Sequence, residues 1–272
     1  MKSIASRDNA QFKAMAKLAA SSSERRRSGL SVLDGAHLLA AYLDAGGKPE
    51  AILVNRAGSE DAEIAALLAR AAPAKATLLA DNLFAQLSTV DSPTGVVASV
   101  VTPTGRAVPP GAGFALLLED IQDPGNVGAL LRSAAAAGVE HALLSPHCAF
   151  AWSPKVLRAG MGAHFSLNVV EGADLGGFLA SFRGTSVALA ASGESSLYDL
   201  DLAKPCAIVV GNEGSGISAA LLEKVKVRAR IPMPGRVESL NAAAAGTVAL
   251  FETVRQRQAV RQRTRMNTDK GG

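Results

Sequence analysis

The stretch LLLEDIQDPGNVGALLRSAAAAGV, residues 116–139, decides how the second half of this chain folds. It begins with apolar residues typical of a buried strand, turns at Pro124-Gly125, and continues with a helical pattern from about Asn126, a residue type that caps helix starts. A strand followed at once by a crossover helix is the building unit of a parallel sheet. We therefore predict an α/β domain with a parallel sheet over residues 113–258.

Two further segments repeat this arrangement of strand, loop and helix. AIVVGNEGSGIS, residues 207–218, runs from a strand into a loop with three glycines in six positions, which let backbone N–H groups approach a ligand. The loop matches neither GxGxxG nor a GKS/GKT phosphate loop, which argues against a nucleotide-dependent oxidoreductase. RIPMPGRVESLNAAAAGTVALFE, residues 230–252, has Ser239 or Asn241 as the cap of an Ala-rich helix that we expect to end at Gln258. All three loops follow strands, at the edge where parallel sheets bind ligands.

Each segment, taken alone, also has a purely structural interpretation. Asn126 can be an N-cap with Arg132 on the surface, since residues six positions apart do not share a helical face. The glycines can form an ordinary connection between strand and helix. Glu213, if buried in that loop, needs a partner. The small residues after Asn241 can serve close packing against a neighbouring helix.

The first hundred residues alternate short apolar strands with helical patterns, which predicts a small α/β domain over residues 1–101. The Pro- and Gly-rich stretch TPTGRAVPPGA, residues 102–112, reads as a linker. The chain carries a net charge of +4, with +5 in residues 1–30 and +5 in residues 255–272, so the part between them carries −6. The basic ends suggest a polyanionic partner or solvated termini. We expect residues 259–272 to be a basic, disordered tail.

Cysteine and histidine give no sign of a metal site. Cys148 and Cys206 are the two cysteines, and the four histidines lack metal-ligand spacing. The N-terminus has no apolar signal core and no run approaches about 18 apolar residues, which predicts a cytoplasmic protein without a membrane partner.

Taken together and in this order, the three segments resemble those of the SpoU/TrmH family of RNA 2′-O-ribose methyltransferases, in the SPOUT superfamily. Residues 1–100 resemble the substrate-binding domain often fused in front of that domain, through SRDNAQFKAMAKL (6–18), DGAHLL (34–39) and SPTGVVASV (92–100). Asp34 stands where many relatives have Glu. The matching residues of the second half are Asn126, Arg132, the loop 211–217, Ile231-Pro232-Met233 and Ser239-Leu240-Asn241.

The resemblance implies a trefoil-knot methyltransferase domain behind an RNA-binding domain. It implies S-adenosylmethionine as the cofactor, held largely by backbone atoms of three loops, and a homodimer with the active site near the subunit interface. No metal is needed, because the sulfonium methyl group is already activated. The implied cofactor-binding residues are Ala191, Gly211, Asn212, Gly214, Gly216, Ile231, Met233 and Leu240.

The resemblance also implies a catalytic set. Arg132 would stabilise the alkoxide that develops at the ribose, or act as its base, and grip a neighbouring phosphate. Asn126 would orient Arg132 or the ribose, and Glu213 would pair with an arginine or fix the loop. Ser239 and Asn241 would complete the polar wall. The RNA would bind the front domain through Lys13, Lys17, Arg25, Arg26 and Arg27.

The two-domain length favours 23S rRNA as the substrate. A tRNA methyltransferase acting on ribose or on a base, and a non-catalytic RNA-binding or ribosome-assembly module on the same fold, stay as alternatives.

Overall fold

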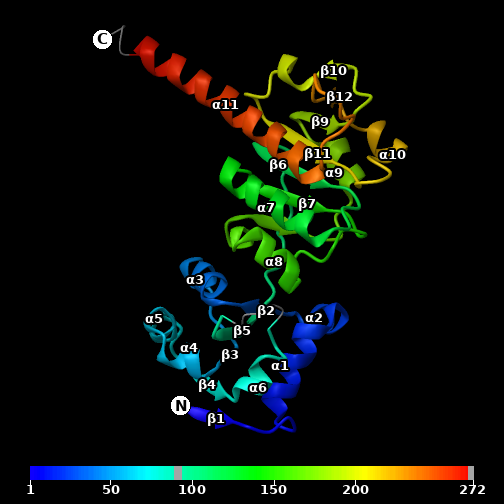
Figure 1. Cartoon of the computed structure of the whole chain (residues 1–272). Helices are drawn as coiled ribbons and strands as arrows, with labels where there is room; N and C mark the ends of the chain where they lie inside the picture. Colours follow the sequence, from blue (N-terminus) through cyan, green and yellow to red (C-terminus); the bar gives the residue numbers. More distant parts are fainter. Residues whose placement is uncertain (89–93, 269–272) are drawn as a thin grey trace. The chain divides into compact units, whose positions relative to one another are not determined.

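The computed structural model of the chain describes residues 1–88 and 94–268, and the side chains as far as residue 263 (Figure 1). The chain forms two compact units. The first contains Met1–Thr104 together with Phe150–Ser166, and the second contains Gly105–Ala149 together with the chain from Leu167 onward. The second unit holds the three segments singled out above.

The second unit is built on a seven-stranded sheet in the order β10-β12-β9-β11-β6-β7-β8, and its paired strands all run parallel. Strand β6 is paired along its whole length with β11, from Phe114 opposite Cys206 to Leu118 opposite Val210. The predicted parallel α/β architecture is therefore confirmed. The strands are β6 (Phe114–Leu118), β7 (His141–Leu144), β8 (Asn168–Val170), β9 (Thr185–Leu189), β10 (Ser195–Ser196), β11 (Cys206–Val210) and β12 (Val227–Arg230).

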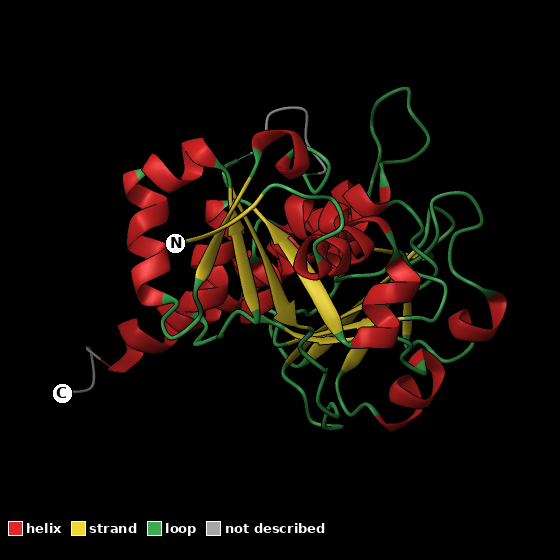
Figure 2. Cartoon of the chain, turned by 90° about the horizontal axis from the view of Figure 1, so that it is seen from below, coloured by secondary structure: helices red, strands yellow, loops and turns green. Residues whose placement is uncertain are grey.

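Helices cover both faces of these strands, because β6 and β11 are apolar on both faces. Figure 2 shows the helices and strands of the chain from below. Helices α7 (Pro124–Ala137) and α11 (Ala242–Thr268) pack against each other, and α11 packs on β11. A Cβ at Gly246 of α11 would stand 2.3 Å from Leu130 of α7, so the small residue permits this close contact. The apolar side chains of α9 (Leu175–Ser181) join those of β6, β9 and β11 in one buried cluster. The short helices α10 (Ala219–Leu222) and η2 (Leu197–Asp199) complete the unit.

The first unit has a five-stranded mixed sheet in the order β1-β4-β3-β5-β2. Strands β1, β4 and β3 run parallel, and β5 runs antiparallel to both β3 and β2. Its core gathers Phe12, Met15 and Phe84 with side chains of the sheet. Its elements are β1 (Lys2–Ile4), α1 (Ala10–Ala20), α2 (Ser22–Ser28), β2 (Leu30–Asp34), α3 (Ala36–Asp44), β3 (Ala51–Val54), α4 (Arg56–Glu60), α5 (Ala62–Arg70), β4 (Ala76–Leu79), α6 (Asp81–Phe84), β5 (Val96–Val101), α8 (Pro154–Gly160) and η1 (Ala163–Ser166).

The units divide the chain differently from the predicted domains. Residues 150–166, expected in the second domain, belong to the first unit, where Arg158 pairs with Asp34 at 3.1 Å and Phe165 packs edge-on against Tyr42. Much of the predicted linker 102–112 belongs to the second unit, because its backbone finds partners there: Arg106 N–H donates to Asn168 Oδ1. Residues 92 and 93 of the SPTGVVASV motif lie outside the described residues.

The prediction of a disordered tail over residues 259–272 is wrong for residues 259–268. Helix α11 continues past Gln258 as far as Thr268, and residues 269–272 lie outside the described part of the chain. The sequence RQRQAVRQR is rich in good helix formers, and the ordered turn before it supplies the nucleus, so elongation costs little. Within the described ranges no helix is long and apolar enough to cross a membrane.

Candidate functional site

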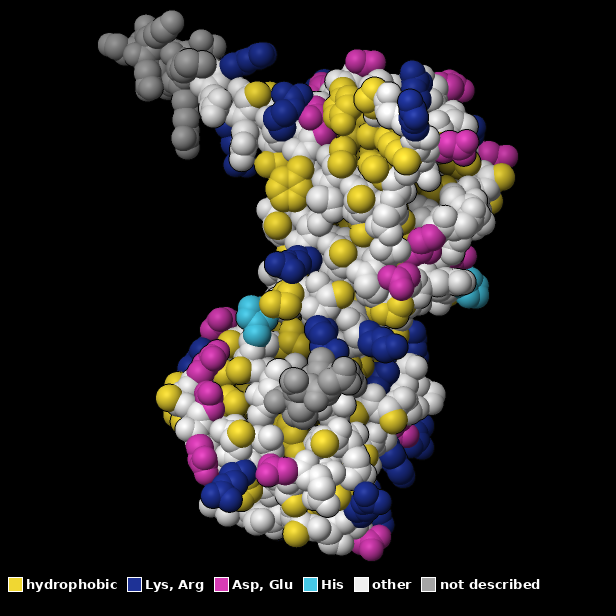
Figure 3. Space-filling model, viewed as in Figure 1, with side chains coloured by type: hydrophobic (Ala, Val, Ile, Leu, Met, Phe, Trp, Pro, Cys, Tyr) yellow, Lys and Arg dark blue, Asp and Glu magenta, His cyan; other side chains and the backbone are white. Residues whose placement is uncertain are grey.

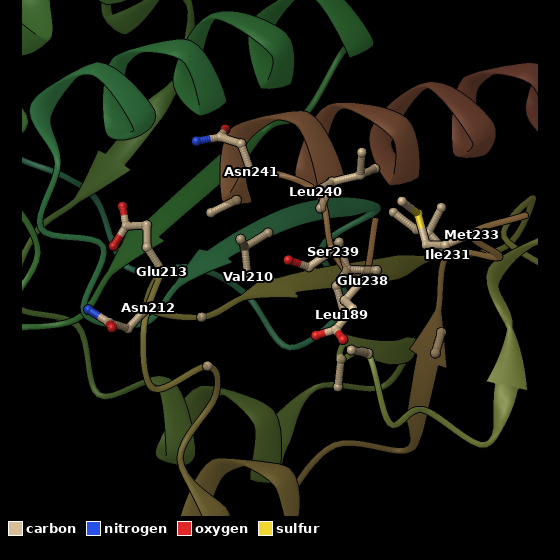
Figure 4. Close-up of a pocket in the computed structure, with 17 residues that line it drawn as sticks. Leu189, Val210, Asn212, Glu213, Ile231, Met233, Glu238, Ser239, Leu240 and Asn241 are labelled. Atoms are coloured by element: carbon tan, nitrogen blue, oxygen red, sulfur yellow. The ribbon is translucent and has the colours of Figure 1, made fainter. Parts of the chain in front are cut away.

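A pocket of about 380 Å³ opens near the ends of β9, β11 and β12 (Figure 4). Three chain segments that are distant in sequence line it: residues 189–191, the glycine loop 210–216, and the segment 229–245 that leads into α11. This is the gathering of loops at the sheet edge that the strand order predicts. Its apolar lining includes Leu189, Val210, Ile231, Met233 and Leu240, and its polar lining is Asn212, Glu213, Glu238, Ser239 and Asn241.

The glycine loop is held in shape by the side chain of Asn212. Its Oδ1 accepts hydrogen bonds from the backbone N–H groups of Gly214 (2.9 Å) and Ser215 (3.0 Å), and its Nδ2 donates to the carbonyl of Asp120 (2.8 Å). A Cβ at Gly211 would stand 2.5 Å from the backbone of Gly216 and Ile217. The loop can close on itself only because position 211 lacks a side chain.

Asn126 connects the three predicted motifs at the rim of the pocket. Its carboxamide oxygen accepts from Nδ2 of Asn241 (3.0 Å), and its nitrogen donates to Oε1 of Glu213 (2.8 Å). Asn241 in turn caps α11, since its Oδ1 accepts from the N–H groups of Ala243 and Ala244. The prediction that Ser239 or Asn241 caps this helix is therefore confirmed for Asn241.

The expectation that Asn126 caps α7 is wrong. The N-cap is Asp123, whose carboxylate accepts from Asn126 N–H at 2.8 Å, and Pro124 occupies the first helical position. Proline suits that position because the N–H it lacks would have no partner in the helix. Asn126 lies inside the first turn, and this leaves its carboxamide available for Glu213 and Asn241.

Most of the predicted site residues meet at this pocket, but not all. Glu213, Ser239 and Asn241 line it, as do all the predicted cofactor residues except Gly214. Arg132 is exposed on α7 and does not line the pocket. No hydrogen bond or ion pair holds its guanidinium to another residue among those described, so it is available to a ligand outside the protein.

Two acidic residues at the end of β6, which the sequence did not single out, bind neighbouring loops. Glu119 accepts from both the N–H (2.8 Å) and the hydroxyl (2.6 Å) of Ser218. Asp120, at φ 56°, exchanges hydrogen bonds with Ser145: its N–H donates to Oγ (2.9 Å) and Oγ donates to its carboxylate (2.5 Å). Two acids directly after the apolar run LLL were the available signal.

The predicted RNA-binding patch of the first unit needs one correction. The Arg25 side chain is buried, and its guanidinium donates to the carbonyls of Leu18 and Ala19. Burial lowers the pKa of Arg25, and the group holds α1 to α2 instead of facing solvent. The other four cations differ in their contacts: Lys17 is exposed, Arg26 lies 4.3 Å over the ring of Phe150, Arg27 pairs with Glu24, and Lys13 pairs with Asp8.

Comparison with known proteins agrees with this geometry. Residues 113–251 match the SpoU rRNA methylase family, and residues 9–98 match an MRM3-like substrate-binding domain. The chain belongs to the SpoU rRNA methylase family. An uncharacterized tRNA/rRNA methyltransferase of Synechocystis is 34% identical over 86% of this chain and 87% of its own length.

Two further SpoU relatives carry more specific names. The 23S rRNA (guanosine(2553)-2′-O)-methyltransferase RlmP of Bacillus subtilis is 29% identical over 92% of this chain and 98% of its own. The crystal structure of the SpoU methyltransferase AviRb from Streptomyces viridochromogenes in complex with AdoMet superposes with a TM-score of 0.82 at 29% identity, over 92% of this chain and 98% of that one. The predicted family and fold are confirmed, and a knotted chain path is consistent with them.

The pocket fits the SpoU cofactor, S-adenosylmethionine. Leu189, Ile231 and Leu240 offer apolar surface for a purine ring. The carboxylates of Glu213 and Glu238 suit a ligand that carries positive charge, and the glycine loop exposes backbone atoms.

Proposed function

We propose that this chain transfers the methyl group of S-adenosylmethionine to a ribose 2′-hydroxyl of 23S rRNA. The observation that carries the proposal is the hydrogen-bonded series Asn241–Asn126–Glu213, which unites the three motif segments at the rim of the cofactor-sized pocket. The names of RlmP and of several other relatives, which are 23S rRNA 2′-O-methyltransferases, support the substrate.

The cofactor supplies an electrophilic methyl group: as the O–CH3 bond forms the S–CH3 bond breaks, the thioether leaves and the hydroxyl proton passes to water, so the protein has to orient and activate the hydroxyl. A guanidinium is a poor general base in proteins, so Arg132 is assigned no proton transfer. Its role is therefore to stabilise the negative charge that develops on the ribose oxygen and to grip an adjacent phosphate. Asn126 and Glu213 hold the glycine loop against α7 and α11. This fixes the position of the methyl donor relative to the sugar.

The remaining expectations are part of the same proposal. The enzyme acts in the cytoplasm, works without a metal, and forms a homodimer through surface near α11. Phe251 on that helix supports the dimer, because 44% of this large apolar side chain is exposed. The first unit binds RNA through Lys13, Lys17, Arg26 and Arg27. To bind phosphate, the two arginines give up only weak contacts at the protein surface.

Methyl transfer with a labelled cofactor tests the proposal. Purified protein is incubated with an unmodified 23S rRNA transcript, a tRNA transcript mixture and a DNA copy of the same 23S segment. We expect label in the 23S transcript alone, recovered in alkali-resistant dinucleotides, because a 2′-O-methyl group blocks alkaline cleavage of the neighbouring phosphodiester. Label in alkali-sensitive nucleotides would show base methylation. Label in tRNA, or none, would support the tRNA enzyme or the non-catalytic module.

A further inference from the structure

Helix α11 is firmly anchored as far as Arg257. The Arg257 guanidinium lies 4.4 Å over the ring of Phe114 and donates to the carbonyl of Gly113 at 2.9 Å. One turn earlier, Thr253 is fully buried. Gln256 donates to the carbonyl of Leu200 and accepts from the N–H of Leu202. The position and direction of the helix are therefore fixed at this point by the body of the second unit.

Beyond this anchor the helix continues as an exposed basic segment, residues 258–263, which we call the C-terminal arm. Figure 3 shows dark blue side chains along this part of the helix, next to the grey residues. The arm contains Arg261 and Arg263, both exposed, and no acidic residue. Neither arginine forms an ion pair or hydrogen bond with any residue of the described ranges. Glu252, the preceding acid on the helix, is already paired with Arg255 at 2.7 Å.

The residues of the arm favour a helix, but their charge pattern adds nothing to the stability of a solvated one. Such helices usually alternate acids and bases four positions apart, whereas here Arg257 and Arg261 place like charges at that spacing. The end of the arm gains no apolar burial that would offset the repulsion. A polyanion lying along the helix would neutralise these charges, and the planar guanidinium group matches phosphate oxygens bidentately. Glutamines at 258 and 262 add further hydrogen-bond donors between the arginines.

We propose that the C-terminal arm binds the phosphate backbone of the RNA substrate at a distance from the methyl-transfer pocket, as a second contact besides the first unit. The identity of the polyanion as RNA rests on the proposed function. The contact itself rests on the arm. An arm on an anchored helix adds affinity without entering the chemistry, so it affects RNA binding and leaves methyl transfer to bound RNA unchanged.

The test compares two double variants that remove the same charge from the second unit. Arg261→Gln/Arg263→Gln alters the arm, and Arg183→Gln/Lys224→Gln removes two exposed cations of the second unit away from the anchor of α11. The dissociation constant for an unmodified 23S rRNA transcript is measured by fluorescence anisotropy from 50 to 200 mM KCl, with circular dichroism as the folding check. We expect the arm variant to bind about tenfold more weakly at low salt, with a salt slope reduced by about two, and the control to stay near wild type.

Two supplementary measurements separate this proposal from the proposed function. The rate at saturating RNA and the affinity for S-adenosylmethionine should match wild type in the arm variant, and Arg261→Lys/Arg263→Lys should restore the salt slope. RNA affinity is measured directly, so it is informative even for a protein that transfers no methyl group. Equal losses in the arm and control variants, or an unchanged salt slope in the arm variant, would overturn the proposal. Binding to anionic phospholipid vesicles is measured in parallel. If the arm variant loses vesicle binding while its RNA binding is intact, the proposal is also overturned.

Discussion

The Asn126 carboxamide donates to Glu213 across 2.8 Å, although 87 residues separate the two in the chain. Its orientation is determined by both neighbours: Asn241 Nδ2 can only donate, so the Asn126 oxygen must accept from it and the nitrogen faces the carboxylate. Asn126 thus takes its two polar partners from the other two motifs. This dependence makes the series testable by substitution.

Asn126→Asp should damage the enzyme more than Asn126→Ala. Both variants lose the donor to Glu213, which is exposed, so the loss is the net value of the hydrogen bond, about 1 kcal/mol, and we expect about a tenfold loss of kcat/KM for alanine. Aspartate adds a carboxylate facing that of Glu213 and should lower kcat/KM further. Steady-state methyl transfer to the 23S transcript measures both.

Ser133→Ala is the matched control for this pair. Ser133 and Thr247 also join α7 to α11 by a hydrogen bond of 2.7 Å, but neither lines the pocket. We expect about 1 kcal/mol lower stability and unchanged kcat/KM. An activity loss in Ser133→Ala equal to that of Asn126→Ala would show that the series only holds the helices together.

Arg132→Ala should retain cofactor binding and lose turnover by at least about two orders of magnitude, because the role proposed for the cation is in the transition state and not in the ground-state cofactor complex. Isothermal titration with S-adenosylmethionine and single-turnover methyl transfer separate the two effects. Cofactor binding should stay normal because Arg132 is exposed and lies outside the pocket. Near-normal turnover would exclude Arg132 from the chemistry.

Gly211→Ala should abolish measurable cofactor binding, whereas Gly214→Ala should be tolerated. A methyl group at 211 meets backbone at 2.5 Å, and backbone cannot move aside without opening the loop. At 214 the nearest atom lies at 3.5 Å, an ordinary contact, so the change in binding should stay within about 0.5 kcal/mol. Equilibrium dialysis of labelled cofactor measures both affinities. Equal affinities in the two variants would contradict the geometry of the loop.

Mild acid should destabilise the first unit through His164. Burial against Trp152 lowers the pKa of His164 from 6.5 to about 4. Between these two pH values the imidazole is protonated in the unfolded chain and neutral in the folded chain. Stability is therefore unaffected above pH 6.5 and falls as the pH drops toward 4, by about 2 kcal/mol between pH 7 and pH 5. Urea unfolding at the two pH values should show this loss in the wild type. His164→Gln should show a loss smaller by about that amount, and an equal loss would contradict the assignment.

Continuous apolar runs made much of the fold predictable. The apolar run that enters the first motif is the strand Phe114–Leu118, which is buried on both faces, because a covered parallel strand needs apolar residues on both. Strands β1 and β10 escaped prediction, since three and two residues are too short to show a period. The assignment of residues 150–166 to the first unit depends on tertiary contacts such as Arg158–Asp34, which no local pattern encodes.

The site could be predicted in part for a similar reason. Loops that follow parallel strands share one edge, so the meeting of Glu213 with Asn241 could be inferred from strand order. The hydrogen bonds from Ser145 to Asp120 and from Ser218 to Glu119 could not, because they depend on which loops lie side by side behind the pocket. The cap at Asp123 was missed because Asn126 has an equally suitable side chain and the choice depends on where Pro124 starts the helix.

The most direct test of methyl transfer to ribose is a map of 2′-O-methyl marks in total RNA from cells with and without this gene. The account predicts that one 23S rRNA position loses its 2′-O-methyl group when the gene is deleted and regains it with the wild-type gene but not with Arg132→Ala. An unchanged set of 2′-O-methyl marks in the deletion strain would contradict it.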